Sequence, residues 1–449
     1  NNTSADTFTI KSEGNKIIIS GNNANSMAVG LNHYLKNYCL TTISWYKDDP
    51  IELPKTLPSI STEVTIKANV PTRFFLNYCT FGYSMTWWKW SDWEHFIDWM
   101  ALNGINMPLA ITGQEAIWYK VWSKLGLTDE EIRGYFTGPA HLPWHRMCNL
   151  DGWQSPLPKE WLSSQAALQE REFNMRPVLP AFAGHVPAAL KRVYPNIKTT
   201  RVSEWGGFAD QYRCTFLNPM DSLYAIIQKE YLTEQTRLYG TNHIYGIDPF
   251  NEIDPPSWDA DSLGMMAKHI YESVAAVDPE AVWLQMTWLF YADIKHWTTP
   301  RIKSYLRSVP QDRLILLDYF CEYTEIWKQT DSYFGQPYLW CYLGNFGGNS
   351  FLSGPVNLVS ERLADALKNG GSNLKGVGST LEGIDLNQFM YEFVLDKAWN
   401  GGQTDKEWFF KLADRRIGKI SPEARKAWEI LANKVYVQPA QVGQGTLTN

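Results

Sequence analysis

From Arg73 onward, short apolar runs alternate with segments that have the pattern of amphipathic helices. Most of the runs are nearly continuous in apolar residues, which is expected of strands buried on both faces. Parallel strands need a long connection between them, so this alternation predicts a parallel sheet with helical crossovers. The eight expected strands are residues 73–79, 105–111, 177–183, 243–250, 281–287, 313–319, 337–343 and 374–380.

The helices between these runs have recognisable ends. Ser91 and Glu94 have the spacing of a capping box, Thr128 begins a second helix, and a third extends from Asp221 to a stop at Gly240. Eight such strand–helix units predict a (β/α)8 barrel with long loops on its catalytic face. An open doubly wound sheet is the alternative, but no G-x-G-x-x-G pattern follows an early strand.

A shorter region precedes the predicted barrel, which we assign to residues 69–400. Residues 1–68 are expected to form a small α/β domain. It begins with a hairpin over Thr7–Ile10 and Lys16–Ser20, and a helix extends from Asn25 to Leu35. We expect a linker over Pro54–Pro71, because this stretch contains three prolines. The segment Thr41–Trp45 is a candidate for one further strand.

Residues 401–449 change character to two helical stretches, Asp405–Ile417 and Pro422–Val435. We expect them to be the beginning of a C-terminal helical domain that is cut short at Asn449. Apolar side chains that would pack on further helices should then be exposed. The side chains expected to be exposed are Trp408, Phe409, Phe410 and Trp428.

Composition excludes several classes of protein. The chain carries 41 Lys and Arg against 47 Asp and Glu without a basic cluster, so nucleic acid is not an expected partner. It has no run of about 18 apolar residues, so no membrane-spanning helix is expected. The 6 cysteines are scattered and define no zinc or disulfide framework. The 21 tryptophans fit either a packed barrel core or a site that stacks on sugar rings.

The first candidate for chemistry is Glu252. The apolar run from His243 to Phe250 ends in Asn251 and Glu252, and Pro255 soon follows. Because proline cannot continue a central strand, Glu252 is placed at the carboxyl end of a strand. Parallel barrels build their active sites at that end. A surface glutamate in a loop is the alternative.

The best partner for Glu252 is Glu382, which follows the run 374–380. The two are so far apart in the sequence that only a closed fold can bring them together. Two carboxylates facing each other across a barrel mouth favour glycoside hydrolysis, with one as acid and the other as nucleophile or base. Two unrelated loop glutamates are the alternative. In a retaining enzyme, the two carboxyl groups should lie roughly 5 to 6 Å apart.

Other chemistries have weaker signals. His141 and His145 have metal-like spacing, but Pro143 interrupts the helix that would align them. The glycine-rich stretch 344–349 lacks the Lys-Ser/Thr of a phosphate loop, and no G-x-S-x-G pattern begins a serine triad. Asp248 is expected inside the barrel or as a residue that orients a loop. We therefore expect neither a metal nor a cofactor.

Several stretches together resemble a known family. They are residues 77–79, 99–106, 113–118, 136–140, 179–187, 243–246, 250–252 and 345–349. In these stretches, and from about residue 73 to 435 overall, the chain resembles the α-N-acetylglucosaminidases of glycoside hydrolase family 89. The resemblance implies that Glu252 is the acid/base and Glu382 the nucleophile. It also implies sugar-pocket roles, with barrel packing as the alternative for each, for Asn77, Cys79, Trp153, Trp205, Asn251, Trp288 and Phe346. Family members carry a long C-terminal helical domain that helps to wall the pocket.

The function that the resemblance implies is retaining exo-hydrolysis of terminal α-linked N-acetylglucosamine from glycans. In such a substrate the 2-acetamido group is cis to the leaving oxygen and cannot attack from behind, so a protein carboxylate must form the covalent intermediate. A glycan-binding protein on an impaired hydrolase barrel is one alternative, although both glutamates are present. A barrel hydrolase of a different glycan, for example a β-linked one, is another.

The sequence leaves the natural glycan and the oligomeric state open. The motif loops are rich in tryptophan and poor in charge, which favours a neutral, mucin-type glycan over a sulfated, heparan-type one. N-glycosylation acceptors occur only at Asn1 and Asn2. This favours an exported bacterial protein, whether periplasmic, cell-surface or secreted, over a lysosomal one.

Overall fold

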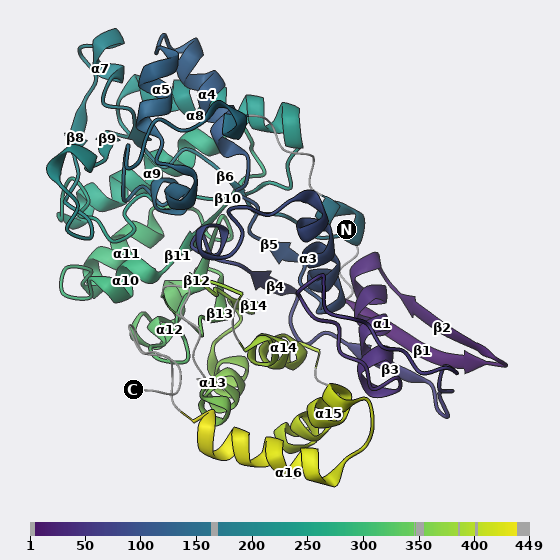
Figure 1. Cartoon of the computed structure of the whole chain (residues 1–449). Coiled ribbons are helices and arrows are strands. Elements are labelled where there is room, and N and C mark those ends of the chain that lie inside the picture. The colour runs from purple at the N-terminus through teal and green to yellow at the C-terminus, as the bar shows by residue number, and fades with distance from the viewer. Residues whose placement is uncertain are drawn as a thin grey trace.

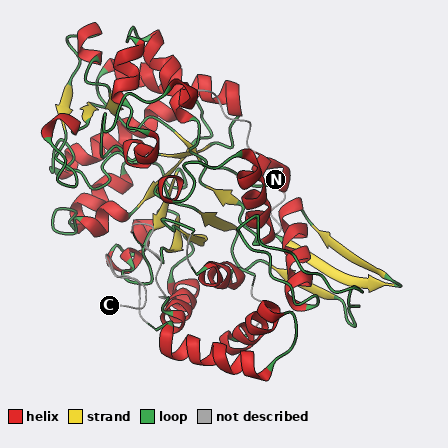
Figure 2. Ribbon diagram, viewed as in Figure 1, coloured by secondary structure: helices red, strands yellow, loops and turns green. Residues whose placement is uncertain are grey.

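A computed structural model of the chain describes residues 5–162, 169–344, 346, 354–384, 387–399 and 403–437. Eight parallel strands lie at its centre and helices surround them (Figures 1 and 2). Each strand overlaps one of the eight predicted runs, so the prediction of a (β/α)8 barrel is confirmed. The strands are β4 Thr72–Phe75, β5 Met107–Pro108, β6 Leu179–Pro180, β10 Ile244–Gly246, β11 Val282–Met286, β12 Leu314–Asp318, β13 Tyr338–Tyr342 and β14 Leu374–Ser379.

A short seam closes the ring of strands. The spatial order is β5-β4-β14-β13-β12-β11-β10-β6, and a parallel bridge between Leu109 and Val178 joins its two ends. The Val178 N–H donates to the Pro108 carbonyl at 2.8 Å, and the Ala110 N–H donates to the Val178 carbonyl at 2.9 Å. Closure of this kind excludes the open doubly wound alternative.

The strands are packed tightly against one another. A Cβ atom on Gly376 of β14 would lie only 2.0 Å from the carbonyl oxygen of Thr72 in β4, so this position requires glycine. Large side chains such as Trp283 of β11 and Trp340 of β13 are fully buried. The tryptophans of the central strands therefore belong to the barrel core.

The helices that cover the strands begin and end as the local sequence dictates. The side chain of Asp221 caps α8, whose chain ends at Gly240, and Thr128 forms a capping box with Glu131. The predicted box at Ser91 is wrong, because the helix begins earlier, with Lys89 at its N-cap. The covering helices are α3 Trp90–Leu102, α4 Gln114–Lys124, α8 Ser222–Tyr239, α9 Ala260–Ala275, α11 Thr299–Arg307, α12 Ile326–Gln329 with η5 Ser332–Gly335, α13 Val356–Asn369 and α14 Gln388–Lys397.

Long excursions follow the carboxyl ends of several strands, as expected for the catalytic face of a barrel. The largest lie between β5 and β10, at the upper left of Figure 1, and contain a three-stranded antiparallel sheet of order β7-β9-β8. The elements of the excursions are α2 Thr80–Tyr83, α5 Asp129–Tyr135, η1 Pro139–His141, α6 Leu142–Arg146, η2 Lys159–Leu162, η3 Gln169–Phe173, β7 His185–Val186, α7 Leu190–Val193, β8 Thr199–Arg201, η4 Asp210–Tyr212, β9 Thr215–Leu217 and α10 Trp288–Ala292.

The N-terminal module contains the predicted hairpin and helix, β1 Thr7–Glu13, β2 Lys16–Gly21 and α1 Ala24–Asn37. The prediction of a strand at Thr41–Trp45 is wrong. Trp45 instead packs as coil against Trp99 of α3, with ring centroids 5.3 Å apart. The third strand is β3 Val64–Lys67, which pairs with β1 inside the stretch predicted as linker.

Arg73 joins this module to the barrel. Its side chain is fully buried and donates to the Gly104 carbonyl at 2.6 Å and to the Asn25 side chain at 3.1 Å. It also forms an ion pair with Asp6. A buried guanidinium is tolerated because these acceptors replace its water. The start of the first barrel strand is thus anchored to α1 and to the chain before β1.

The C-terminal segment forms α15 Asp405–Ile417, α16 Pro422–Ile430 and η6 Leu431–Val435. The expectation that Trp408 and Phe409 are exposed is wrong: they are 6% and 4% exposed, because both pack on Phe393 of α14. Phe410 and Trp428 are half-buried. Among the described residues 403–437, the exposed large apolar side chains are Ile417, Ile420, Ile430 and Val437.

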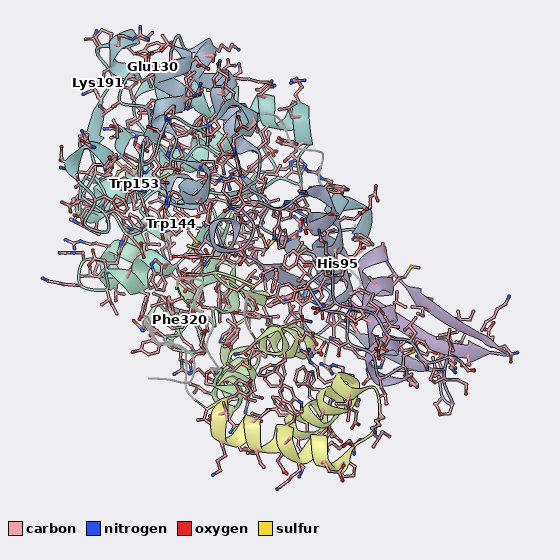
Figure 3. The ribbon with its side chains drawn as sticks, in the orientation of Figure 1. His95, Glu130, Trp144, Trp153, Lys191 and Phe320 are labelled. Atoms are coloured by element: carbon pink, nitrogen blue, oxygen red, sulfur yellow. The ribbon has the colours of Figure 1, made fainter. Side chains whose placement is uncertain are left out.

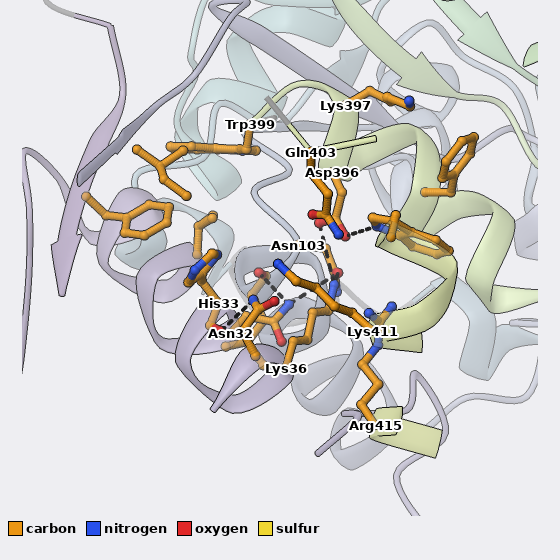
Figure 4. Close-up of a pocket in the computed structure, with 17 residues that line it drawn as sticks. Asn32, His33, Lys36, Asn103, Asp396, Lys397, Trp399, Gln403, Lys411 and Arg415 are labelled. Atoms are coloured by element: carbon orange, nitrogen blue, oxygen red, sulfur yellow. Dashed lines mark hydrogen bonds and ion pairs between the residues drawn. The ribbon is translucent and has the colours of Figure 1, made fainter. Parts of the chain in front are cut away.

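A buried cluster of charges holds α1, α14 and α15 together. Glu392 of α14 lies 3.4 Å from the Lys36 ammonium and 2.9 Å from the Arg415 guanidinium. Lys36 also donates to Asn103 at 3.1 Å (Figure 4), beside a cavity of about 80 Å³. Burial alone would raise the pKa of Glu392, but Lys36, Arg415 and Arg416 outweigh it and lower the pKa to about 2.

Among the described helices, none is long and apolar enough to cross a membrane. The domain boundaries near residues 68 and 400 stay predictions.

Removal of the Glu392 charge should destabilise the fold. Glu392→Gln leaves two buried cations without their shared anion, so the free energy of unfolding in urea should fall by about 3–5 kcal/mol at neutral pH. Since the pKa of Glu392 is lowered to about 2, its contribution is fully present above about pH 4.5 and is lost as the pH falls through 2. The difference between the two proteins should therefore shrink in acid.

The control for this prediction is Glu361→Gln, which changes an exposed glutamate of α13. It should alter the free energy of unfolding by less than about 0.5 kcal/mol. Equal stability of Glu392→Gln and the wild-type protein near neutral pH would contradict the prediction.

Candidate active site

Glu252 and Glu382 follow strands on opposite sides of the barrel. Glu252 comes after β10 and Glu382 after β14, with three strands between these two along the sheet order. Both glutamates therefore stand at the carboxyl-end mouth, where the loops of the two strands converge.

Two tryptophans hold the Glu252 carboxylate. The indole N–H of Trp288 donates to one oxygen at 2.6 Å, and that of Trp205 donates to the other at 2.7 Å. Trp288 follows β11 directly, whereas Trp205 comes from the excursion between β8 and β9. The backbone of Glu252 has φ +52°, in the left-handed region that side chains rarely adopt. The carboxylate thus has a defined orientation although the residue is exposed.

Asn149 also lies beside Glu252, and no sequence signal pointed to it. With its carboxamide turned so that both ends are satisfied, the nitrogen donates to the Asn251 carbonyl at 2.6 Å. The oxygen then accepts from Trp205 Nε1 at 3.0 Å. Asn149 therefore contacts both the backbone before Glu252 and the indole that holds its carboxylate.

The turn that carries Glu382 is bound to the turn after β4. Asn77 Nδ2 donates to the Thr380 carbonyl at 2.9 Å, and Thr80 Oγ donates to the Leu381 carbonyl at 2.5 Å. The two residues that accept these hydrogen bonds immediately precede Glu382 in the chain. The Asn77 side chain thus positions the Glu382 turn at the mouth, as a buried amide between two adjacent strands.

Cys79 and Tyr83 lie within electrostatic reach of both carboxylates. Burial raises the pKa of the Cys79 thiol well above its usual value, and the negative charges of Glu382 and Glu252 raise it further. Burial and the same two carboxylates, together with Cys79, also raise the pKa of Tyr83. Both glutamates therefore lie near Cys79, which precedes α2 after strand β4.

Aromatic side chains line the mouth on two sides. Trp153 contacts Phe208 at a centroid distance of 4.9 Å, and Phe208 stacks on Trp205. On the other side, Phe346 lies 5.9 Å from Trp288 and 5.0 Å from Phe320. Figure 3 labels Trp153 and Phe320, which lie above and below Trp144 in that view. All of the predicted aromatic site residues therefore connect, directly or through one ring, to the tryptophans that hold Glu252.

Asn251 is placed differently. Its side chain is buried, and its amide nitrogen faces the Met147 sulfur at 3.7 Å. A sugar-binding role for Asn251 stays a prediction. The stretch 345–349 lies outside the described residues except for Phe346.

His145, one of the two histidines with metal-like spacing, has other partners. His145 lies 3.2 Å from the Leu150 carbonyl oxygen and 3.3 Å from Asp151. Within the described ranges, one group of side chains has metal-ligand spacing: Asp254, Asp293 and His296, with ligand atoms within 4.8 Å of one another. This group is exposed or half-buried, and such spacing is common at surfaces without an ion.

Comparison with known proteins identifies the family. Residues 73–401 match the model of the α-N-acetylglucosaminidase TIM-barrel domain, and residues 1–59 match that of its N-terminal domain. The chain belongs to the α-N-acetylglucosaminidase family, glycoside hydrolase family 89. It is similar to human α-N-acetylglucosaminidase, with 41% identity over 441 residues, which cover 96% of this chain and 59% of the human protein.

Solved members of family 89 have the same fold. The Clostridium perfringens enzyme in complex with 2-acetamido-1,2-dideoxynojirmycin matches with a TM-score of 0.88 and 28% identity, over 98% of this chain and 50% of that one. A variant of the Clostridium enzyme with two glutamates changed to glutamine, in complex with its substrate GlcNAc-α-1,4-galactose, matches with a TM-score of 0.87, 28% identity and the same coverage. The chain thus spans about half the length of these relatives.

The Cys79 thiol should be protonated and unreactive in the folded protein. Burial is the larger cause of its raised pKa, so iodoacetamide near pH 8 should leave Cys79 unmodified, as measured by peptide mass spectrometry. Unfolding in urea should make all of the cysteines reactive, which provides the control. Rapid modification of Cys79 in the folded protein would contradict this environment.

Proposed function

We propose that this chain hydrolyses terminal α-linked N-acetylglucosamine from the non-reducing ends of glycans, with retention of configuration. The observation that carries the proposal is the pair of glutamates at one mouth of the closed barrel, Glu252 after β10 and Glu382 after β14. Family membership supports the choice of sugar. The Clostridium relative supports the linkage, because its double glutamate variant is in complex with GlcNAc-α-1,4-galactose.

In this proposal Glu252 is the general acid and base. Its carboxylate is exposed and accepts two indole N–H groups, so it is oriented and open to a substrate oxygen. A positioned acid of this kind contributes about 10²–10⁴-fold to the rate. Glu382 is the nucleophile: it follows a different strand, and a protein carboxylate is required because the cis 2-acetamido group cannot attack.

The remaining predicted residues complete the sugar site in this proposal. Trp153, Trp205, Trp288 and Phe346 supply aromatic faces for stacking on the sugar ring. Asn77, Cys79 and Asn251 supply polar atoms, although Asn77 and Asn251 also have the structural contacts described above. The mechanism requires no metal, because two carboxylates are sufficient for double displacement.

The presence of both carboxylates at one mouth favours an enzyme over a glycan-binding protein on an impaired barrel. A neutral, mucin-type glycan and export from a bacterial cell are the substrate class and the location that we propose. The substrate class rests on the charge-poor motif loops, and the location rests on the occurrence of N-glycosylation acceptors only at Asn1 and Asn2.

The roles of the two glutamates should be distinguishable with substrates whose leaving groups differ in their need for a proton. Glu382→Ala should abolish turnover of every substrate, because the nucleophile is lost. Glu252→Ala should lower hydrolysis of natural linkages by about 10²–10⁴-fold, while a dinitrophenyl glycoside still forms the covalent intermediate. That intermediate should accumulate, and azide should release it as the α-azide, as measured by burst kinetics and mass spectrometry.

The control for this pair is Glu204→Ala, which removes an exposed glutamate next to Trp205. The rates of hydrolysis of both substrates by this variant should stay near those of the wild-type protein. If Glu382→Ala kept a burst and Glu252→Ala did not, the roles would be reversed, and near-normal turnover in both variants would place the active site elsewhere.

The stereochemistry of the product tests retention. Proton NMR of the first turnovers should show release of the α-anomer of N-acetylglucosamine, because two inversions restore the configuration. A crystal structure should then place the two carboxyl groups roughly 5 to 6 Å apart. Initial release of the β-anomer, with a separation of about 9 Å, would instead make Glu382 a general base.

A further inference from the structure

The loop that presents Glu252 leaves β10 in a sharp turn. Residues 247–252 connect the strand to a glutamate whose φ is +52°. Such a conformation persists only where surrounding contacts hold it. Because Glu252 ends this loop, any loosening of the backbone before it moves the carboxylate.

Two buried side chains hold the loop backbone. The Nε2–H of His185, in β7, donates to the Pro249 carbonyl at 3.0 Å. This contact settles the tautomer, since a carbonyl can only accept. The Asp248 carboxyl accepts the N–H of Met286, the last residue of β11, at 2.8 Å. We refer to these two hydrogen bonds, from His185 and to Asp248, as the loop clamp.

The clamp lies inside the protein rather than at the mouth. His185 and Asp248 are each 6% exposed. They border a cavity of about 40 Å³ that Tyr78 and the buried ion pair of Glu115 with Arg146 also line. Burial lowers the pKa of His185 to about 4 and raises that of Asp248 to about 7. Between these values, both side chains hold the loop without a net charge.

The loop clamp and the two tryptophans make different kinds of contact around Glu252. Trp205 and Trp288 bind the Glu252 carboxylate itself. His185 and Asp248 instead bind backbone groups, at the loop and at the neighbouring strand. We propose that His185 and Asp248 are positioning residues that aim Glu252 at the glycosidic oxygen. This inference rests on the proposed function, in which Glu252 is the general acid.

The proposal has a selective kinetic consequence. Protonation of a poor leaving group depends on the placement of Glu252, whereas attack by Glu382 depends on the loop after β14. A misplacement of about 1 Å can cost about 10²-fold in rate. Loss of the clamp should therefore slow formation of the covalent intermediate from alkyl or sugar α-glycosides much more than from a dinitrophenyl glycoside, whose phenolate leaves without a proton.

The test compares kcat/KM, which reports formation of the covalent intermediate and excludes the later step in which Glu252 is the base, for a GlcNAc-α-1,4-galactose substrate and for the dinitrophenyl α-glycoside. His185→Phe keeps the ring volume and removes the N–H, so it should slow the first substrate about 10–100-fold and the second by less than about 3-fold. His185→Gln keeps a side-chain N–H for Pro249 and should restore most of the loss. Asp248→Ala should act as His185→Phe does, and Asp248→Asn, which keeps an acceptor for Met286, should be milder.

Asp318→Asn is the matched control. Asp318 is also a buried carboxyl at the end of a barrel strand, with a pKa raised by burial to about 7. Its oxygens accept the N–H groups of Ile326 and Trp327 rather than binding the Glu252 loop. This variant should change kcat/KM for both substrates by the same factor. Thermal unfolding of every variant checks that it is folded.

A loss confined to the disaccharide, with recovery in His185→Gln, supports the proposal. Equal losses on both substrates, or no loss on either, overturn this inference alone. If His185→Phe does not fold, the Asp248 pair makes the same comparison. A wild-type protein that hydrolyses neither α-glycoside overturns the proposed function and this inference with it.

Discussion

The bridge between Leu109 and Val178 is the interaction on which the arrangement of the site depends. The strands β5 and β6 are only two residues long, and this bridge joins them and closes the ring. In an open sheet of the same order, β10 and β14 would be four strand spacings apart, about 19 Å. Closure curves the sheet so that Glu252 and Glu382 face a common centre and both act on the pKa of Cys79.

The carboxyl groups of the molecule differ in their burial and therefore in their pKa values. Inside the barrel, burial raises the pKa of Asp248, Asp318 and Glu322 to about 7, and all of these bind backbone N–H groups. Glu392 is equally buried but stays ionised, because Lys36 and other cations surround it. Glu252 is exposed at the mouth, where indole N–H groups orient it. The carboxyl groups of Asp248, Asp318, Glu322 and Glu392 are thus buried and bind neighbouring groups of the protein. Glu252, which is proposed to transfer a proton, is exposed to solvent.

The tryptophans serve two purposes, and their environments distinguish them. Trp283 and Trp340 fill the barrel and have almost no exposed surface. Trp205 and Trp288 are half-buried and donate to Glu252. Packing in the barrel core therefore explains the first group, and contact with Glu252 distinguishes the second. Stacking on a sugar is a further role that the proposed function assigns to the second group.

The sequence by itself determined the eight strands, the caps at Thr128 and Asp221, and the place of Glu252 after β10, because periodicity, capping and strand ends are local patterns. Only the tertiary structure placed Asn149 beside Glu252 and buried Trp408 on α14. It also paired β3 with β1, although prolines around that segment had indicated a linker. These outcomes depend on contacts between segments far apart in the chain. Such contacts form only when the barrel closes and its side chains pack closely, so no local sequence pattern predicts them.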